Sequence, residues 1–313
     1  MSRKLGKSVR EAFGLALANL GESRADVVVV DGDVNNSTRT DFFAKKFPTR
    51  FFNVGIAESN MVGVAAGLAS SGKQAWVSSF AAFIICNAYD QLRMSVAFPD
   101  IDVKVVGTHA GISIGEDGPS QMGIEDVSLA CSLPNFTVVV PADEISTEKA
   151  VNALAEIKTP AYLRAGRPYV PLVYEKGCDF RLGKAIRLRD GKDVTIIANG
   201  LLVAPALDAA EKLAGSGIQA RVLDMHTVKP CDDAAVLAAA TETGRIVVAE
   251  EHLAHGGLGS AVAMSAARQK PVPMRFVNLG DRFAESGTPE GLIEKYGLTA
   301  DHIVKAVRVL TGK

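Results

Sequence analysis

Two side chains able to do acid–base chemistry follow expected strand ends in this sequence. Glu58 lies in the first turn of an expected helix rich in Gly and Ala. His109 is the second residue of the loop 108–123, which also contains Asp117 and Gln121. A carboxylate buried at such a turn is costly unless a donor meets it, whereas an imidazole changes charge near neutral pH. Alone, Glu58 is explained as a complement to the helix dipole, and a lone His is most often structural. The loop 108–123 nevertheless predicts a polar pocket just past a strand.

Aromatic and basic residues at two further strand ends have two possible roles each. Phe80 and Phe83 are spaced to share one helical face, so they belong either to the core or to an aromatic wall for a planar heterocycle. Arg164 and Arg167 close the first half of the chain, where two cations either lie on the surface or hold a phosphate or carboxylate. The residues alone leave both choices open.

Two other motifs suggest metal or phosphate sites. The segment 31–37 is rich in Asp and Asn, but no second Asn ligand follows at a suitable distance in the same domain, so we expect it to cap the next helix. The segment 250–259 contains His252 and His255, only three residues apart, and a Gly-x-Gly too short to specify a dinucleotide fold. We interpret this second segment as the turn that starts a helix.

Short β-branched runs alternate with helical segments along the chain, a pattern typical of βαβ units and parallel sheets. The sequence predicts strands at residues 26–31, 50–54, 74–79, 103–107, 136–140, 161–164, 194–199, 220–224, 245–250 and 274–279. It predicts helices at residues 8–20, 40–46, 58–70, 82–97, 122–132, 143–157, 204–215, 232–241, 259–268, 289–296 and 300–310. The expected fold class is α/β, with two doubly wound domains, each a mostly parallel sheet flanked by helices. They cover residues 1–178 and 190–313, joined by a polar linker at 179–189.

Composition excludes several classes of protein. The chain has 313 residues, a net charge of −1 and 48% hydrophobic residues, with 6% aromatic residues. Neither a long basic run nor an uninterrupted apolar stretch of membrane-spanning length occurs, so we expect neither a nucleic-acid partner nor a membrane. The four cysteines are far apart and form no Cys-x-x-Cys motif, which favours a reduced, cytoplasmic protein.

Four motifs together resemble the C-terminal half of transketolase, its pyrimidine-binding domain followed by its C-terminal domain. They are Val-Gly-Ile-Ala-Glu-Ser-Asn-Met at 54–61, Ser-Phe-Ala-Ala-Phe at 79–83, Gly-Glu-Asp-Gly-Pro-Ser-Gln-Met at 115–122 and Val-Lys-Pro at 228–230. Each motif is weak alone, but the set is specific, and the similarity runs over essentially the whole chain. The resemblance implies a transferase that moves a two-carbon ketol unit from a ketose phosphate to an aldose acceptor.

The resemblance also implies roles for individual residues. In that family the glutamate at the position of Glu58 is catalytic and hydrogen-bonds N1′ of the cofactor, thiamine diphosphate. His109 is the second catalytic candidate, and it binds the sugar hydroxyls together with Asp117. Besides Glu58, the cofactor-binding candidates are Phe80, Phe83 and Gln121. The candidates that bind the substrate phosphate are Arg10, Ser37 and Arg167. Many family members have His where this chain has Gln121, and because an amide transfers no proton we assign Gln121 to binding.

The diphosphate-binding domain of full-length transketolase, with its Gly-Asp-Gly metal motif, is absent from this sequence. The resemblance therefore implies the β subunit of a split transketolase. Mg²⁺ would be held mainly by a companion N-terminal subunit, with no metal ligand in this chain, and the expected assembly is α₂β₂. Two alternatives remain. One is the β subunit of a 2-oxo-acid dehydrogenase or a 1-deoxyxylulose-5-phosphate-synthase-like enzyme, and the other is a non-catalytic assembly subunit.

Overall fold

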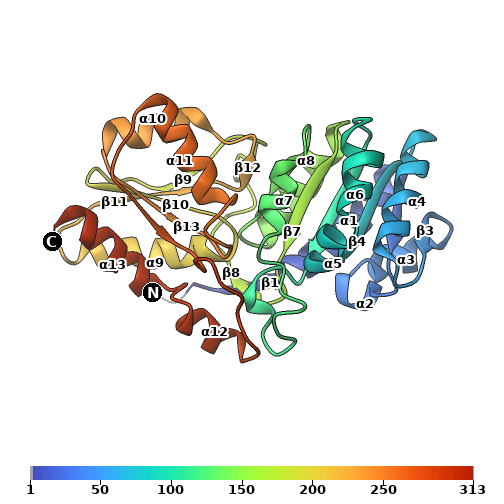
Figure 1. The fold of residues 1–313 in the computed structure, drawn as a ribbon, viewed down its shortest axis with the longest axis horizontal. Helices are drawn as coiled ribbons and strands as arrows, with labels where there is room; N and C mark the ends of the chain where they lie inside the picture. The colour runs from blue at the N-terminus through green and yellow to red at the C-terminus, as the bar shows by residue number, and fades with distance from the viewer. Residues whose placement is uncertain (1–2, 313) are drawn as a thin grey trace.

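The computed structural model describes residues 3–312 and has two α/β domains lying side by side (Figure 1). The first domain is built on a seven-stranded sheet with the order β12-β6-β7-β5-β4-β2-β3. Its strands are β2 (Val27–Asp31), β3 (Phe51–Asn53), β4 (Gln74–Phe80), β5 (Val103–Thr108), β6 (Thr137–Val139), β7 (Ala161–Ala165) and β12 (Thr227–Lys229). All neighbouring strands run parallel except β12, which pairs antiparallel with β6. The central strands are buried on both faces, which explains runs such as Val27 to Val30.

Helices cover both faces of this sheet. One face carries α1 (Val9–Ser23), α3 (Asp41–Lys46) and α8 (Glu144–Glu156), packed around buried residues such as Phe13 and Trp76. The other face carries α4 (Glu58–Ser70), α5 (Ala81–Cys86) and α7 (Asp126–Ser132). Asp143 caps α8 through a capping box with Ser146, as the sequence predicted for the start of that helix.

The second domain repeats this plan with a smaller sheet. Its strands are ordered β14-β13-β10-β11-β9, and only the edge strand β9 is antiparallel. The strands are β9 (Ile186–Arg189), β10 (Val194–Ala198), β11 (Ala220–Asp224), β13 (Ile246–Ala249) and β14 (Met274–Val277). Its longer helices are α9 (Val203–Ala214), α10 (Asp233–Glu242), α11 (Leu258–Gln269) and α13 (Ala300–Thr311). The first and last of these pack on one face and the other two on the opposite face, so both domains are doubly wound as expected.

The two domains share structure that the sequence did not predict. Residues 186–189, assigned to the linker, form β9, and residues 227–229 leave the second domain to extend the sheet of the first. A separate antiparallel pair joins β1 (Leu5–Ser8) to β8 (Tyr169–Pro171). One hydrophobic core contains buried residues from both domains, so the domain junction is packed like an interior.

Two expected helices differ from the prediction. The helix expected at 82–97 is broken into α5, α6 (Tyr89–Gln91) and a π-helical turn (Leu92–Ala97). At the break the Ser59 hydroxyl donates a hydrogen bond to the carbonyl of Asn87. The helix expected at 122–132 begins only at Asp126, because residues 122–125 complete the returning limb of the loop 108–123.

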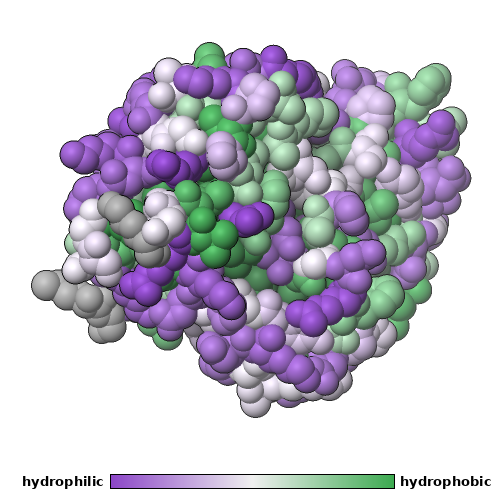
Figure 2. Space-filling view, turned by 60° about the vertical axis from the view of Figure 1, so that its left-hand side comes forward, coloured by the Kyte–Doolittle hydropathy of each residue, from purple (hydrophilic) through white to green (hydrophobic). Residues whose placement is uncertain are grey.

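Figure 2 brings the second domain forward and shows mainly hydrophilic side chains interrupted by smaller hydrophobic groups. Exposed hydrophobic residues of this domain include Met264, Phe276 and Phe283. No helix within residues 3–312 combines the length and the hydropathy needed to span a membrane.

Candidate active site

The first candidate residue, Glu58, is the first residue of α4 and is 7% exposed. The helix starts here because Gly55 takes a left-handed φ of 76° just after β3 and turns the chain. The Ser79 hydroxyl, at the end of β4, donates a hydrogen bond of 3.1 Å to Oε1 of Glu58. Oε2 of Glu58 makes no hydrogen bond within residues 3–312, so one carboxylate oxygen is left for a ligand.

His109 follows β5 with a φ of 55°, which is uncommon for a residue with a side chain. Its ring stacks on Phe80 at a centroid distance of 3.8 Å. Nε2 lies 2.8 Å from Nη1 of Arg10, and Nδ1 lies 2.9 Å from Oγ1 of Thr108. Since a guanidinium can only donate, Nε2 must accept, and the hydrogen-bond network therefore assigns the proton to Nδ1.

The environment of His109 keeps the ring neutral. Burial, followed by the positive charges of Arg10, Arg167 and Arg39, lowers the pKa of His109 to about 3. The imidazole is therefore a hydrogen-bond acceptor at neutral pH, rather than a source of positive charge.

Hydrogen bonds connect His109 to Glu58. His109 Nδ1 donates to Thr108, whose hydroxyl donates 3.2 Å to the carbonyl of Ser79. The hydroxyl of the same Ser79 donates to Glu58. The two candidate catalytic residues, 51 positions apart in the sequence, are thus joined through the adjacent ends of two neighbouring strands.

Phe80 and Phe83 stack on each other, and Phe80 also packs against the hydrophobic core of the second domain, so the core and the aromatic-wall interpretations both stay open. Their rings are parallel within 6° and their centroids lie 5.6 Å apart. Both residues are only partly buried, in contrast to the neighbouring Ile84 and Ile85 in the core. Because His109 stacks on Phe80, the aromatic pair lies directly against one of the two candidate catalytic residues.

Three arginines gather around His109. Arg10 Nη1 also donates 2.9 Å to the carbonyl of Ser37, while Arg10 Nε is buried and has no hydrogen-bond partner among residues 3–312. Burial, then the charges of Arg39 and Arg167, lowers the pKa of Arg10. Since like charges repel, this cluster is a site where an anion would bind favourably.

Arg39 is the member of this cluster that sequence reasoning missed. It takes a left-handed φ of 68° at the end of the short helix α2 (Asn35–Thr38), and its Nε is also buried with no partner in the described part of the chain. The backbone at Arg39 approaches α1 so closely that a Cβ on Gly14 would lie 2.3 Å from the Arg39 carbonyl oxygen. The feature of the sequence that could have identified Arg39 is its position two residues after Ser37, which was already a candidate for binding the substrate phosphate.

The remaining loop residues lie at the open side of the site. Arg167 is 37% exposed, donates 2.7 Å to the carbonyl of Ile114 and pairs with Asp117 at 3.6 Å. Gln121 is hydrogen-bonded to Ser120 and makes no hydrogen bond to another candidate within residues 3–312. The structure therefore brings together Arg10, the Ser37 carbonyl and His109 directly, and leaves Gln121 without such a contact.

One suggested anion ligand is corrected by the structure. Arg164 is only 7% exposed, because its guanidinium donates to Asp126 at 2.9 Å and to the carbonyl of Gly123 at 3.0 Å. The surface interpretation of Arg164 is therefore wrong. Arg164 does hold carboxylates, but they are those of Asp126 and Glu251 inside the protein.

The two motifs that suggested metal or phosphate sites have structural roles. Asp31 is buried and accepts from Thr38, Thr40 and the amide of Val34. Glu250 accepts from the amides of Leu258 and Gly259 and so caps α11, as expected for a helix start. Among the residues that the structure describes, no group of three or more His, Cys, Asp or Glu is arranged to hold a metal ion.

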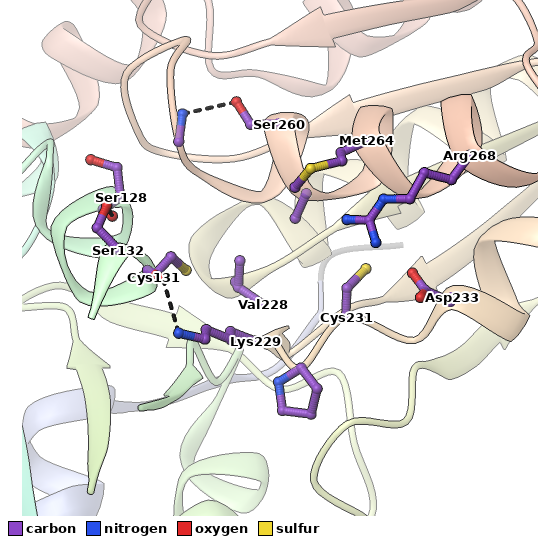
Figure 3. A pocket seen from close by; sticks show the side chains of 13 residues that line it. Ser128, Cys131, Ser132, Val228, Lys229, Cys231, Asp233, Ser260, Met264 and Arg268 are labelled. Atoms are coloured by element: carbon purple, nitrogen blue, oxygen red, sulfur yellow. Dashed lines mark hydrogen bonds between the residues drawn. The ribbon is translucent and has the colours of Figure 1, made fainter. Parts of the chain in front are cut away.

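A cavity of about 500 Å³ lies elsewhere, between α7, β12 and α11 (Figure 3). The Lys229 ammonium donates 3.0 Å to the carbonyl of Cys131 at its edge, and the Arg268 side chain points into it. Burial raises the pKa of the thiols of Cys131 and Cys231 to about 12, so both are protonated at neutral pH. None of the lining residues belongs to the site around Glu58 and His109.

The fold and the site define a two-domain α/β protein with a cluster of polar and aromatic side chains at the carboxyl edge of the sheet of its first domain. Residues 6–171 match the family model described as transketolase, pyrimidine binding domain, and residues 183–303 match the model described as transketolase, C-terminal domain. The chain belongs to the transketolase family.

Relatives differ in how much of their length this chain covers. It is 42% identical to "Transketolase-like protein 2" of Mus musculus over 97% of this chain, but it spans only 49% of that protein. It is 40% identical to "Putative transketolase C-terminal section" of Methanocaldococcus jannaschii, over 96% of this chain and 95% of that one. It is 41% identical to "6-deoxy-6-sulfo-D-fructose transketolase subunit SqwH" of a Clostridium species, over 97% and 95%. The chain thus spans about half of the animal protein and nearly all of the two microbial ones.

Solved structures agree with the fold. The structure described as "Split gene transketolase, inactive beta4 tetramer" matches with a TM-score of 0.90 and 45% identity, over 98% of this chain and 99% of that one. Transketolase from Campylobacter jejuni matches with a TM-score of 0.84 over all of this chain and 47% of that one. At 20% identity the second match supports the fold alone.

Proposed function

We propose that this chain is the C-terminal, β subunit of a split, thiamine diphosphate-dependent transketolase. The single observation that carries the proposal is the setting of Glu58, a buried carboxylate with one oxygen bound by Ser79 and the other without a hydrogen bond to any residue from 3 to 312. Phe80, which directly follows Ser79, forms a stacked pair of partly buried rings with Phe83. A carboxylate and a flat apolar wall are the groups that would hold an aminopyrimidine ring, so the residues present fit the cofactor.

Each candidate residue has a defined task in this proposal. Thiamine diphosphate, when bound, supplies the carbon nucleophile that carries the two-carbon unit. Glu58 would hydrogen-bond a ring nitrogen through Oε2 and hold the proton there, while Ser79 keeps Oε1 oriented. Phe80 and Phe83 would supply apolar surface next to the ring and exclude water from it. Gln121 can bind the cofactor by hydrogen bonds but transfers no proton.

The substrate side of the site is built for an anionic sugar. His109 is neutral, so its Nε2 can accept a hydrogen bond from a sugar hydroxyl in place of the one from Arg10. Asp117 is available for further hydroxyls once a phosphate competes for Arg167. Arg10, Arg167 and the newly identified Arg39 would then neutralise the phosphate. We therefore propose a ketose phosphate as donor and an aldose, with or without phosphate, as acceptor.

The proposal includes a companion subunit. The diphosphate group and Mg²⁺ need ligands that we expect on an N-terminal transketolase subunit, and the similarity to the archaeal C-terminal section supports a split enzyme. One face of α4 is open, since a Cβ on Gly63 or Gly67 would meet nothing within 4 Å, and nearby Ile56 and Phe98 are each 80% exposed. Small residues allow close packing of helices, so we propose this face as a subunit contact in an α₂β₂ assembly.

The experiment is a reconstitution. The purified chain, an N-terminal transketolase subunit, thiamine diphosphate and Mg²⁺ are mixed with xylulose 5-phosphate and ribose 5-phosphate, and transfer of the ketol unit is followed by product analysis. We expect turnover with the ketose phosphate and none when either subunit is omitted. Turnover with pyruvate instead of a ketose would support the 2-oxo-acid or 1-deoxyxylulose-5-phosphate alternative. No turnover with any donor, despite assembly, would contradict the proposal.

A non-catalytic assembly subunit is the second candidate. The solved relative is described as an inactive β tetramer, which is consistent with a chain that associates without reacting. The two candidates differ in the effect of Glu58→Ala on the reconstituted complex. Loss of turnover with assembly retained supports catalysis, whereas unchanged turnover supports a scaffold role.

A further inference from the structure

The C-terminal domain contacts the loop that carries His109 with a buried carboxylate. Glu251 follows β13, is 4% exposed, and accepts a hydrogen bond of 2.7 Å from the backbone amide of Ser113. Two residues further on, the amide of Leu253 donates 3.0 Å to the carbonyl of Ile124, the residue that directly follows the other end of this loop. One segment of the second domain therefore holds both limbs of the loop 108–123.

Gly111 lies directly against Glu251. Its φ is 83°, and a Cβ built on it would lie only 2.2 Å from the Glu251 carboxyl carbon. Only glycine adopts this backbone conformation readily and leaves room for the carboxylate at this position. The carboxylate fills the space left by the missing side chain two residues after His109.

Arg164 links Glu251 to the returning limb of the loop. Its Nη1 lies 3.7 Å from Oε2 of Glu251, and its Nη2 donates 3.0 Å to the carbonyl of Gly123. The amide of Gly111 donates 2.7 Å to that same carbonyl. Glu251, Arg164 and the Gly111–Gly123 bridge thus form one buried network across the domain junction.

His109 needs such support, because its φ of 55° is an unfavourable conformation for a side-chain-bearing residue. A strained residue persists only where its surroundings over-determine it. We propose that Glu251 is a positioning residue, which holds the start of the loop so that His109 presents Nε2 to Arg10 and to the substrate. The C-terminal domain would then take part in building the active site.

The matched control is the neighbouring buried carboxylate, Glu250, which caps α11 within its own domain and does not bond the loop. The measurement is amide hydrogen exchange at Gly111, whose partner is the Gly123 carbonyl and not Glu251 itself. It uses the full chain and needs no turnover. In Glu251→Ala we expect exchange at Gly111 to be at least about tenfold faster than in the wild type, the effect of weakening one or two hydrogen bonds.

Glu251→Gln keeps an acceptor for the Ser113 amide but loses the charge facing Arg164, so we expect an intermediate rate and a folded protein. Glu250→Gln should lower the melting temperature and leave exchange at Gly111 unchanged. Two results would each overturn the proposal: unchanged exchange at Gly111 in both Glu251 variants, or equal acceleration in Glu250→Gln.

The kinetic consequence rests on the proposed function, and it is measured separately in the reconstituted enzyme. Misplacing His109 should raise KM for the ketose donor about tenfold while kcat changes less, because binding of the sugar is weakened more than the chemistry at the cofactor. Faster exchange at Gly111 together with an inactive wild-type complex would contradict the proposed function alone. Unchanged exchange with an active wild type would contradict only the role of Glu251.

Discussion

The carboxyl edges of the two sheets have similar residues but opposite uses. Within residues 3–312, Glu58 at the edge of the first sheet keeps one oxygen without a hydrogen bond, and Arg10 and Arg39 each have a buried nitrogen without a partner. At the edge of the second sheet, Glu250 caps its own helix and Glu251 is bound to the loop of the first domain. Open α/β sheets bind ligands at this edge. The unpaired groups of the first sheet include two arginines whose charges act on His109, whereas the unpaired oxygen of Asp224 at the second edge is fully buried. The second sheet uses its polar groups to hold structure.

The largest expected effect comes from removing the free carboxylate of the first edge. Glu58→Gln keeps the size and the hydrogen bond to Ser79 but cannot hold a proton on the cofactor ring, so turnover should fall about 100-fold or more. Steady-state kinetics of the reconstituted enzyme measure this, with Glu148→Gln on the exposed face of α8 as control. Wild-type turnover in Glu58→Gln would remove the distinction between the two edges.

A smaller effect is expected at the cation cluster. Arg39→Gln should raise KM for a phosphorylated donor about tenfold, the loss of one charge-assisted hydrogen bond, with little change in kcat. A non-phosphorylated ketose is the matched control substrate, and its KM should hardly change. An equal rise for both substrates would mean that Arg39 supports the local fold, where Gly14 packs against its backbone.

At the second edge a carboxylate affects stability instead of turnover. Asp224 is fully buried, accepts 2.6 Å from the Tyr174 hydroxyl and has one oxygen without a partner. Burial raises its pKa to about 7. Between pH 4 and 7 the folded protein therefore binds a proton that the unfolded chain lacks, and this residue lowers stability as pH rises, by up to about 1.4 kcal/mol per pH unit.

The side chain of Asn does not ionise, so Asp224→Asn removes the cost of a buried negative charge. The variant should therefore be more stable than the wild type at pH 8 and lose this advantage towards pH 4. Chemical denaturation at several pH values measures the difference in the free energy of unfolding. A difference that does not depend on pH would show that Asp224 is not protonated in this range.

The smallest expected change is at His109, whose ring should remain neutral at pH 5. Its pKa of about 3 lies below the ordinary value of 6.5, so between these values the unfolded chain binds a proton that the folded chain does not. This residue therefore lowers stability as pH falls through that range. Nitrogen chemical shifts of the imidazole report its charge directly, and titration of His109 near pH 6 would contradict the enclosed site described here.

The sequence by itself determined the two α/β domains, because alternating buried strands and amphipathic helices leave local patterns in composition. It also determined the residue types at the first edge, including Glu58, His109 and the two phenylalanines, since these stand in recognisable motifs. The start of α11 at Leu258 followed from the glycines of the segment 250–259.

Only the tertiary structure decided which of these polar groups remain free. Arg164 and Arg167 are three residues apart in one motif, yet Asp126 and Gly123 bind the first inside the protein while the second stays 37% exposed. Arg39, the strand β12 in the sheet of the first domain, and the contact of Glu251 with Gly111 likewise depend on segments far apart in the chain. Hydrogen-bond partners and burial are set by residues that are distant in the sequence, so they cannot be read from a local pattern of residue types.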